Sequence, residues 1–362
     1  MSEEEIIYLI KLSLFERFGR GALRKLLRVF HTFKEIFSAS AAALVATGIS
    51  PAAAQAFVEK RAGLRVEDVL TRLRQEGVSV IPFDDPRYPP LLAQIHDAPA
   101  LLYARGEPEG LASTLPLAVI GTRKMTAYGE RAVMLLAAPL AAAGCCIVSG
   151  LALGVDAAAH WSCLEANGLT VAVLGSGVDD ASIGPRTNLP LARRILDSGG
   201  VLLSEYPPGV QGDKHRFPMR NRIIAGLCRG VIIVEAAEKS GALLTANLAL
   251  QYDRDVFAVP GPITQPTSTG SNRLLSQGAI PACSAEGILT HYALPSAPTA
   301  PKPAPDDEYG RMICQALAAG CLNLDDLAER TELPTPRLLS AITMLELSGH
   351  ISKVGDKYGI RC

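Results

Sequence analysis

The sequence has few Cys and His, the residues that form disulfides in small folds and bind metal ions. Eight Cys occur among 362 residues without one CxxC pair, and the six His are scattered along the chain. Cys145 and Cys146 are adjacent inside an apolar run that we expect to be a buried strand. This pattern argues against a disulfide framework and against structural zinc, so we predict neither a metal nor a cofactor.

The sequence also lacks an excess of charge and a membrane segment. The 35 Lys and Arg against 36 Asp and Glu give a formal net charge of -1, so a nucleic-acid partner must be argued from local clusters. No apolar run approaches the ~20 residues of a membrane span. The start, MSEEEIIYLI, is acidic where a targeting peptide would be basic. We therefore expect a cytoplasmic protein without a membrane span.

Length and composition predict more than one domain. A chain of 362 residues with 48% hydrophobic residues is long enough for two or three domains with sizeable cores. The segment 294–307, LPSAPTAPKPAPDD, lacks apolar periodicity and is expected to be a linker rich in Pro and Ala. A softer break with many turn residues lies near 78–105. We thus expect domains over 1–77, 78–293 and 308–362.

The N-terminal segment is expected to be helical. The stretches GALRKLLRVF and VEDVLTRLRQEG carry apolar residues at helical spacing. Between them, Ser50 before Pro51 is typical of an N-cap followed by the first helical residue. We expect a small bundle of the helix-hairpin-helix or sterile-alpha-motif type. It would serve either as a weak contact to the DNA backbone or as a packing and interaction domain.

The middle of the chain alternates between apolar runs and helical stretches. Six short runs rich in Val, Ile and Leu are PLAVIG, CCIVSG, TVAVLG, VLLSEY, GVIIVEA and DVFAVPG. Strands of this kind bridged by helices predict an extended, doubly wound parallel sheet covered on both faces, in an α/β fold. Such open sheets bind ligands beyond the carboxyl ends of their strands, so functional residues are expected directly after each run.

Three of these runs end in turns that suit an anion. The turns are Gly121, Thr122 and Arg123 after the first run, Ser149 and Gly150 after the second, and Gly175–Gly177 after the third. Glycine lets the backbone approach a ligand closely, while hydroxyls and helix-start N–H groups donate to phosphate oxygens. Three such turns on one sheet edge favour a polyanion over ordinary turn chemistry. They do not match a GxGxxG fingerprint or a Walker-type loop.

The densest cluster of polar residues is KHRFPMRNR. It contains Lys214, Arg216, Phe217, Arg220, Asn221 and Arg222. A ring among cations offers a stacking face for a base while the cations bind the backbone of a nucleic acid. The alternatives are a solvated charged loop and, for Arg220 or Arg222, a buried structural arginine, because both directly precede the apolar IIAGL.

A further anion site is predicted after the fifth run. Ser240 and Gly241 stand near a helix start, and Thr245 follows one turn later. Backbone N–H groups and hydroxyls at such a start bind phosphate, and the serine can also act as an N-cap. Both roles are compatible.

No residue is assigned a catalytic role. Asp156 and His160 are four residues apart on one predicted helix and could meet on its surface. No GxSxG nucleophile elbow accompanies them, so a structural or ligand-orienting pair is the preferred interpretation. Glu205 and Glu235 are the other candidate acids, and nothing in the sequence brings them together.

With these residues in view, the sequence resembles the DNA-processing protein A (DprA/Smf) family of natural transformation. The resemblance covers most of the chain. Its ordered motifs are PRYPPLL, DAPALLYARG, VIGTRKMTAYG, SGLALGVDAAAH, LLSEYPPG, FPMRNRIIAGL, VIIVEAAEKSGALLTAN, VFAVPGP and GSNRLLSQGA. The resemblance implies a dimeric, extended Rossmann fold that binds single-stranded DNA, protects incoming DNA and loads recombinase RecA, without enzymatic activity. A single-strand-binding protein is a further candidate partner.

The family motifs fall on residues that the turns and clusters above already include. The G-[ST]-R turn corresponds to Gly121–Arg123, whose Arg would bind a backbone phosphate. The K-x-x-F element corresponds to Lys214 and Phe217, a cation and a stacking ring, and the S-G-x-x-x-T element to Ser240–Thr245, again facing phosphate. The chain departs from the family in GVDDASIGPRTN, where relatives read GLD followed closely by YP and Asn, so the role of loop 178–188 is open.

The C-terminal segment resembles the optional winged helix of this family. Three helical stretches precede HISKV and KYGIR, which would pair through a Gly-Asp turn. From Glu308 onward there are six basic and seven acidic residues, and the predicted recognition helix carries only Arg337 as a cation. A groove-reading winged helix makes several phosphate contacts. We therefore expect a protein-contact or regulatory role here.

Two other functions remain open from the sequence. Enzymes that hydrolyse nucleotide N-glycosidic bonds share a related Rossmann core and carry a catalytic Glu in a PGGxGTxxE stretch. The corresponding SGALLTAN has no acid at that place. A sensor of a free nucleotide would use the same phosphate turns.

Overall fold

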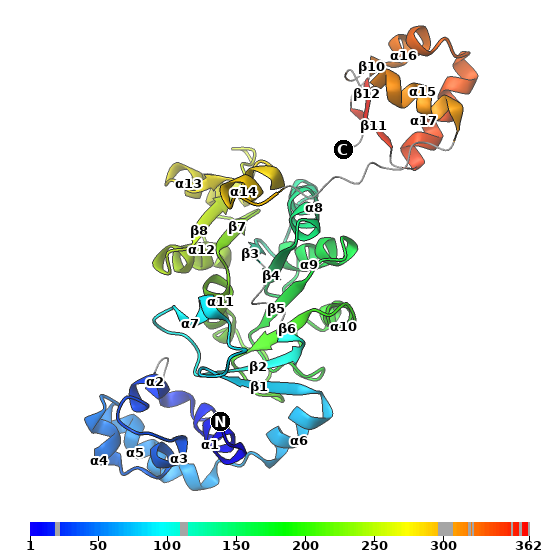
Figure 1. The fold of residues 1–362 in the computed structure, drawn as a ribbon. Coiled ribbons are helices and arrows are strands. Elements are labelled where there is room, and N and C mark those ends of the chain that lie inside the picture. The colour runs from blue at the N-terminus through cyan, green and yellow to red at the C-terminus, as the bar shows by residue number, and fades with distance from the viewer. Residues whose placement is uncertain are drawn as a thin grey trace. The chain divides into compact units, whose positions relative to one another are not determined.

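The computed structural model describes residues 1–18, 22–108, 115–295, 307–317, 320, 322–348, 350–354 and 357–360. The chain divides into two compact units, Met1–Ala297 and Pro298–Cys362 (Figure 1). Each unit has its own hydrophobic core. In the described part of the chain, no helix combines the length and the apolarity that crossing a membrane requires.

The first unit is built on one nine-stranded sheet. Its strands are β1 (Val78–Pro82), β2 (Leu101–Gly106), β3 (Leu115–Ile120), β4 (Cys145–Ser149), β5 (Thr170–Leu174), β6 (Val201–Ser204), β7 (Gly230–Ile233), β8 (Asp255–Ala258) and β9 (Ile280–Pro281). They are ordered β1-β2-β6-β5-β4-β3-β7-β8-β9, and every pair from β6 to β9 is parallel. The predicted doubly wound parallel sheet is confirmed. The strand order reverses between β3 and β7, which is where open sheets of this type bind ligands.

Three strands go beyond the six runs that the sequence indicated. β1 pairs antiparallel with β2, and β2 pairs antiparallel with β6, so the segment interpreted as a softer break extends the sheet. Its Pro and turn residues lie between the two strands or at Pro82, the last residue of an edge strand, where a missing N–H is tolerated. β9 has only two residues, too few for a recognisable pattern.

Helices cover both faces of the sheet (Figure 1). One face packs against α7 (Pro90–Ala93), α11 (Arg216–Leu227), α12 (Gly241–Gln251) and α13 (Thr269–Ser276). The other packs against α8 (Ala127–Ala142), α9 (Val155–Glu165), α10 (Leu189–Asp197) and α14 (Ala285–His291). Central strands such as β4 and β5 are buried at every residue. Burial on both faces explains the near-continuous apolar runs, each large side chain contributing roughly 1.5–3 kcal/mol.

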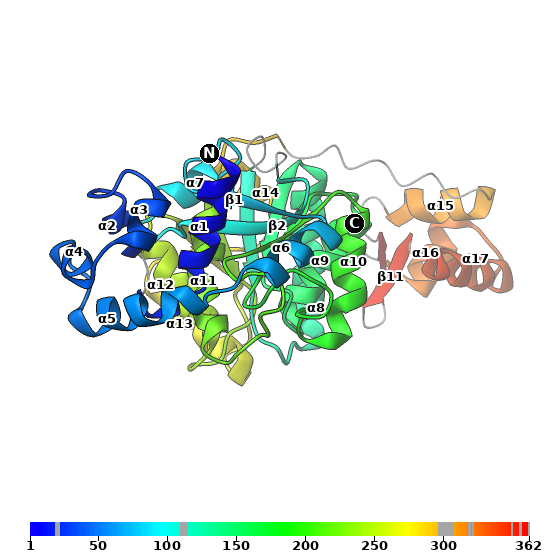
Figure 2. The same ribbon diagram turned by 90° about the horizontal axis from the view of Figure 1, so that it is seen from below.

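In the described residues, six α-helices precede β1. They are α1 (Glu3–Ser13), α2 (Ala22–Leu26), α3 (Phe33–Ser38), α4 (Ala41–Ala46), α5 (Pro51–Lys60) and α6 (Glu67–Gln75). The Ser50 side chain accepts from the N–H of Ala53 at the start of α5, as the sequence predicts for an N-cap. Leu9 and Phe57 belong to the same hydrophobic cluster as Tyr103 of β2 and Leu202 of β6. The helices therefore pack against the β1–β2 end of the sheet (Figure 2).

The second unit is a winged helix, as the sequence predicts. It contains α15 (Glu308–Leu317), α16 (Leu324–Thr331), α17 (Thr335–Leu347), β10 (Leu322–Asn323), β11 (Ile351–Val354) and β12 (Lys357–Ile360), with the strands ordered β10-β12-β11. Arg337, on the predicted recognition helix, donates to the Tyr309 hydroxyl and lies over its ring. The predicted Gly-Asp turn and linker residues 296–306 lie outside the described residues.

Candidate nucleic-acid interface

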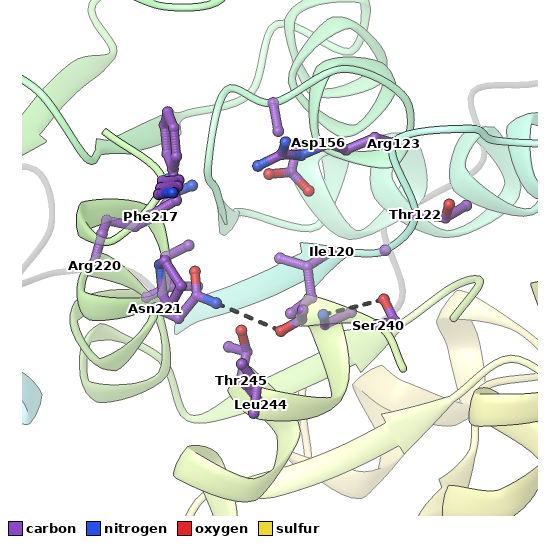
Figure 3. Close-up of a pocket in the computed structure, with 17 residues that line it drawn as sticks. Ile120, Thr122, Arg123, Asp156, Phe217, Arg220, Asn221, Ser240, Leu244 and Thr245 are labelled. Atoms are coloured by element: carbon purple, nitrogen blue, oxygen red, sulfur yellow. Dashed lines mark hydrogen bonds between the residues drawn. The ribbon is translucent and has the colours of Figure 1, made fainter. Parts of the chain in front are cut away.

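A pocket of about 400 Å³ lies at the carboxyl end of β3, beside the point where the strand order reverses. Figure 3 shows Phe217, Arg220 and Asn221 entering it from α11, and Ser240, Leu244 and Thr245 from the start of α12. Ten of the thirteen predicted site residues line it. These are Gly121, Thr122, Arg123, Lys214, Phe217, Arg220, Asn221, Ser240, Gly241 and Thr245. Their role in binding stays a prediction.

The turn after β3 places Arg123 at the pocket because the backbone at Gly121 lies close to Val155 and to the Glu235 carbonyl. A Cβ at Gly121 would lie 2.7 Å from the Val155 Cγ2 and 2.9 Å from the Glu235 carbonyl oxygen, so only glycine fits. The Thr122 N–H donates to that same oxygen at 2.8 Å, and the Thr122 hydroxyl accepts from the Lys124 N–H at 3.1 Å. These backbone donors are therefore occupied, which leaves the Thr122 hydroxyl hydrogen and the exposed Arg123 side chain to meet a ligand.

The start of α12 supplies a second set of donors. Ser240 is its N-cap, and its hydroxyl accepts from the Ala242 N–H at 3.2 Å. Thr245 is buried one turn later and still lines the pocket. The Asn221 side chain donates to the Gly241 carbonyl at 3.5 Å and so links α11 to α12. The first N–H groups of an 11-residue helix and its dipole favour negative charge at this end.

The Arg123 guanidinium lies over the Phe217 ring, and both side chains line the pocket. The guanidinium carbon of Arg123 lies 5.5 Å from the centroid of the Phe217 ring, within the range of cation–π attraction. The ring rests on backbone, because a Cβ at Gly175 would lie 3.0 Å from its Cδ1 and one at Gly212 3.1 Å from its Cζ. A ring and a cation are therefore held together, with Lys214 exposed one turn before the ring.

Two buried side chains of opposite charge, Arg220 and Asp156, line the pocket. Burial lowers the pKa of Arg220 to about 10, while Asp156 raises it and Arg123 lowers it further. Burial raises the pKa of Asp156, opposed by Arg220 and by the Gly150 N–H, which donates to its carboxylate at 3.1 Å. Arg220 also donates to the Val173 carbonyl. With a pKa of about 10, Arg220 remains protonated near neutral pH. Its positive charge offsets the negative charge of Asp156, which would otherwise repel a phosphate.

Three predicted site residues, Ser149, Gly150 and Arg222, do not line this pocket. Ser149 is fully buried and donates to the Val119 carbonyl at 2.7 Å. Gly150 lines an adjoining hollow, and its N–H is taken by Asp156. Arg222 is 1% exposed and donates to both carboxylate oxygens of Glu205 at 2.7 and 2.6 Å. The side chains of Ser149 and Arg222 are thus engaged in contacts within the fold.

The candidate catalytic groups are also engaged in structural contacts. Asp156 and His160 do not meet on a helix surface, since both are buried. Glu205 accepts from Arg222, and Glu235 accepts from the Thr126 N–H, the Thr126 hydroxyl and the Thr267 hydroxyl at 2.7–3.0 Å. Within the described residues, no three His, Cys, Asp or Glu side chains gather in a way that could bind a metal ion.

His160 should make stability depend on pH. The Thr170 hydroxyl donates its only hydrogen to the Ile147 carbonyl, so His160 Nδ1 is the donor in its 2.7 Å bond to that hydroxyl. Nε2 is then a buried acceptor without a partner in the described part of the chain. Burial, and secondarily Arg220, lower the pKa of His160 to about 3 from the model-compound value of 6.5.

The expected result follows from proton linkage. Between pH 6.5 and about 3 the unfolded chain binds a proton that the folded chain does not, so unfolding becomes easier as the pH falls, by at most about 1.4 kcal/mol per pH unit. Denaturant titrations over this range should show a smaller slope for His160→Gln, which keeps a donor for Thr170. Equal slopes for the two proteins would contradict the assignment.

Several lining residues were not predicted from the sequence. They are Ile120, Ala152, Asp156, Pro218, Ile224, Ala242 and Leu244. All seven lie within the family motifs, but most are apolar and so gave no indication of binding chemistry. Ala152 could have been found, since it lies three residues after the end of β4 and therefore at the ligand-binding edge of the sheet.

The fold and the pocket place the chain in a definite class, α/β proteins that combine an extended Rossmann-type domain with a winged helix. The family follows from two sequence models: DNA recombination-mediator protein A matches residues 79–293, and the DprA winged helix domain matches residues 296–357. The chain belongs to the DNA recombination-mediator protein A family. The resemblance drawn from its motifs is confirmed.

Individual relatives agree with this family. The chain is 39% identical to Protein Smf of Escherichia coli K12 over 342 residues, covering 92% of this chain and 90% of the relative. The X-ray structure of DNA processing protein A from Streptococcus pneumoniae superposes with a TM-score of 0.66 at 34% identity, covering 80% of this chain and 98% of that one. The Helicobacter pylori structure, described as showing a single-stranded DNA binding mode, gives 0.54 at 32% identity, covering 60% and 95%.

Proposed function

We propose that this protein binds single-stranded DNA in the pocket between α11 and α12 and loads RecA onto the incoming strand during natural transformation or recombination. The single observation that carries the binding proposal is the convergence of ten motif residues from three chain segments on one pocket. The Helicobacter pylori relative, 32% identical, is described as binding single-stranded DNA. A homodimer, RecA loading and contact with a single-strand-binding protein rest on family membership.

The chemistry of the pocket supports a strand as the ligand. Arg123 and Lys214 are exposed cations at its rim, and the hydroxyls of Thr122 and Thr245 face the same space. Cations and helix-start donors bind phosphate, while an aromatic ring accepts any base by stacking. This combination gives affinity for a backbone without sequence preference.

We propose no catalytic step at this site. Asp156 is the acid among the described residues of the pocket wall; it accepts from the Gly150 N–H and interacts electrostatically with Arg220. Glu205 and Glu235 are bound by Arg222 and by threonines. These contacts support a binding protein over a glycosidic hydrolase.

The length of the ligand tests this proposal. A strand-binding protein should bind dT oligomers more tightly as they lengthen over roughly 4 to 16 nucleotides, and salt should weaken the binding. Fluorescence anisotropy with labelled oligomers, competed by thymidine monophosphate, measures both. Saturation by the mononucleotide, with no gain from longer strands, would instead establish a nucleotide sensor or hydrolase.

The second unit should contribute little to DNA affinity. A chain ending near Leu294 keeps the whole pocket, which lies within the first compact unit. The second unit has six basic and seven acidic residues from Glu308 onward, and electrostatics supply most non-specific affinity. We expect the truncated chain to fold, dimerise and bind DNA nearly as well as the whole chain. Gel-shift titrations check this, and a loss of tenfold or more, about 1.4 kcal/mol, would show that the winged helix binds DNA.

A further inference from the structure

The proposed function leaves one strongly charged segment of the N-terminal helices without a role. Residues 17–34 contain six Lys and Arg and no Asp or Glu. We refer to them as the basic segment. Residues 1–77 together have 12 Lys and Arg against 9 Asp and Glu, in a chain whose formal net charge is -1. Positive charge is therefore concentrated in a part of the chain that does not line the pocket.

The fold turns apolar residues of the basic segment inward and cations outward. Ala22 and Leu26 of α2 are buried, as is Phe33 at the start of α3. The Arg28 N–H donates to the Lys25 carbonyl at 3.2 Å, so these two residues lie one turn apart and their side chains are neighbours. Both side chains are exposed. Two adjacent cations are thus held at the surface by the buried residues on either side of them.

These cations are not neutralised by acids of the same unit. Within the described part of the chain, Arg17, Lys25 and Arg28 form no ion pair. Lys34, by contrast, is paired with Glu4 at 2.9 Å, so α1 neutralises the far end of the basic segment. Like charges at neighbouring positions of a helical turn repel one another. An anion that contacts several of them would relieve this repulsion.

We propose that the basic segment binds the phosphate backbone of duplex DNA. This inference goes beyond the proposed function and does not depend on the pocket. Among the described residues of the segment, no aromatic ring is exposed, since Phe18 and Phe30 are half-buried and Phe33 is buried. Cations without a stacking face offer little to the bases of a single strand. A duplex instead presents a continuous row of phosphates, one charge per ~1.7 Å of its axis.

An anionic membrane surface is the main alternative partner. Leu27 and Val29 are 37% and 58% exposed beside the cations, as in segments that lie on a membrane. The strength of such binding scales with the apolar area that enters the membrane. Leu26 and Phe33 belong to the hydrophobic core of the first unit, so little apolar surface is left for a membrane. The contact of the cations with phosphates is therefore the better-supported role.

Removing two cations tests the inference. The full chain is titrated into a labelled blunt duplex and, separately, into a labelled short dT oligomer. Each phosphate contact contributes about 0.9 to the salt slope on duplex DNA, so Lys25→Ala/Arg28→Ala should lower that slope by about 1.8. Its loss of duplex affinity should then be about 12-fold greater at 50 mM than at 200 mM salt. Affinity for the dT oligomer should stay unchanged.

Two further variants separate charge from structure. Lys25→Arg/Arg28→Lys keeps both charges and should bind the duplex as the unaltered protein does, because a non-specific phosphate contact requires only a cation. Arg65→Ala/Arg74→Ala is the matched control, since it removes two charges from exposed positions of the N-terminal segment outside residues 17–34. The control should leave the salt slope unchanged. Circular dichroism of each variant checks that the fold is intact.

The failure of this inference and the failure of the proposed function give different results. If the unaltered protein does not bind the dT oligomer, the proposed function fails, and the duplex titrations still decide on the basic segment. The inference is overturned if the unaltered protein does not bind the duplex, or if Lys25→Ala/Arg28→Ala keeps the duplex slope. An equal fall in the control, or an equal loss for duplex and dT oligomer, overturns it as well.

Vesicles of phosphatidylglycerol and phosphatidylcholine test the alternative partner. We expect the unaltered protein and Lys25→Ala/Arg28→Ala to cosediment with these vesicles to the same small extent. Loss of vesicle binding in this variant, with unchanged duplex affinity, would assign the basic segment to a membrane surface and overturn the inference.

Discussion

Arg222→Ala should destabilise the first unit by about 3 kcal/mol or more, while DNA affinity per folded molecule stays unchanged. Arg222 is 1% exposed, and its Nη2 donates to both oxygens of Glu205. Its Nε lies 3.7 Å from an oxygen of Asp97, whose side chain is 13% exposed. Removing one partner of a buried ion pair leaves the other charge uncompensated, which costs roughly 3–5 kcal/mol. Because the Glu205 side chain is 29% exposed and water can reach it, we expect a loss at the lower end of this range.

Urea unfolding followed by circular dichroism measures this loss, and oligonucleotide titration of the refolded variant measures the affinity. Arg131→Ala on α8 serves as the control, because Arg131 is exposed and outside the pocket. The free energy of unfolding of Arg131→Ala should differ from that of the unaltered protein by no more than about 0.5 kcal/mol. An Arg222→Ala protein of normal stability that has lost DNA binding would return Arg222 to the interface.

Arg220 and Arg222 show why the cation cluster could not be resolved from the sequence. Both belong to α11, and two positions along a helix differ by about 200° in direction. One side chain therefore lines the pocket while the other meets Asp97 and Glu205. Neither acid belongs to α11: Asp97 comes long before it, and Glu205 follows β6 in another segment. No helical spacing therefore indicated the pair.

The predicted turns lie at the carboxyl edge of the sheet, but some of their backbone N–H groups already have partners within the fold. Apolar runs revealed the strands, and the topology of a parallel sheet put Thr122 and Gly150 at its carboxyl edge. The backbone donors expected to bind phosphate are occupied by the Glu235 carbonyl and the Asp156 carboxylate. Such distant acceptors are visible only in the folded chain. What remains for a ligand is side chains and the start of α12.

Arg123→Ala should weaken binding of single-stranded DNA by roughly 1–3 kcal/mol and lower the salt slope by about 0.7, the value of one phosphate contact on a single strand. Arg123 is exposed, lines the pocket and lies over Phe217. Lys124→Ala is the neighbouring control, because Lys124 is exposed and does not line the pocket. Unchanged affinity of Arg123→Ala across a salt series, with the fold intact, would contradict the phosphate contact.

Phe217→Ala should cost a similar ~1–3 kcal/mol of binding and leave the salt slope unchanged, because stacking releases no counterions. Lys214→Ala should lower the slope, as Arg123→Ala does. The ring also contacts the backbone of Gly175 and Gly212, so its removal should lower the free energy of unfolding as well as the DNA affinity. Urea denaturation of Phe217→Ala measures the loss of stability, and an oligonucleotide titration of the same variant measures the loss of DNA affinity. A large loss of stability with unchanged binding per folded molecule would assign the ring to the core, and the cations alone would then carry the affinity.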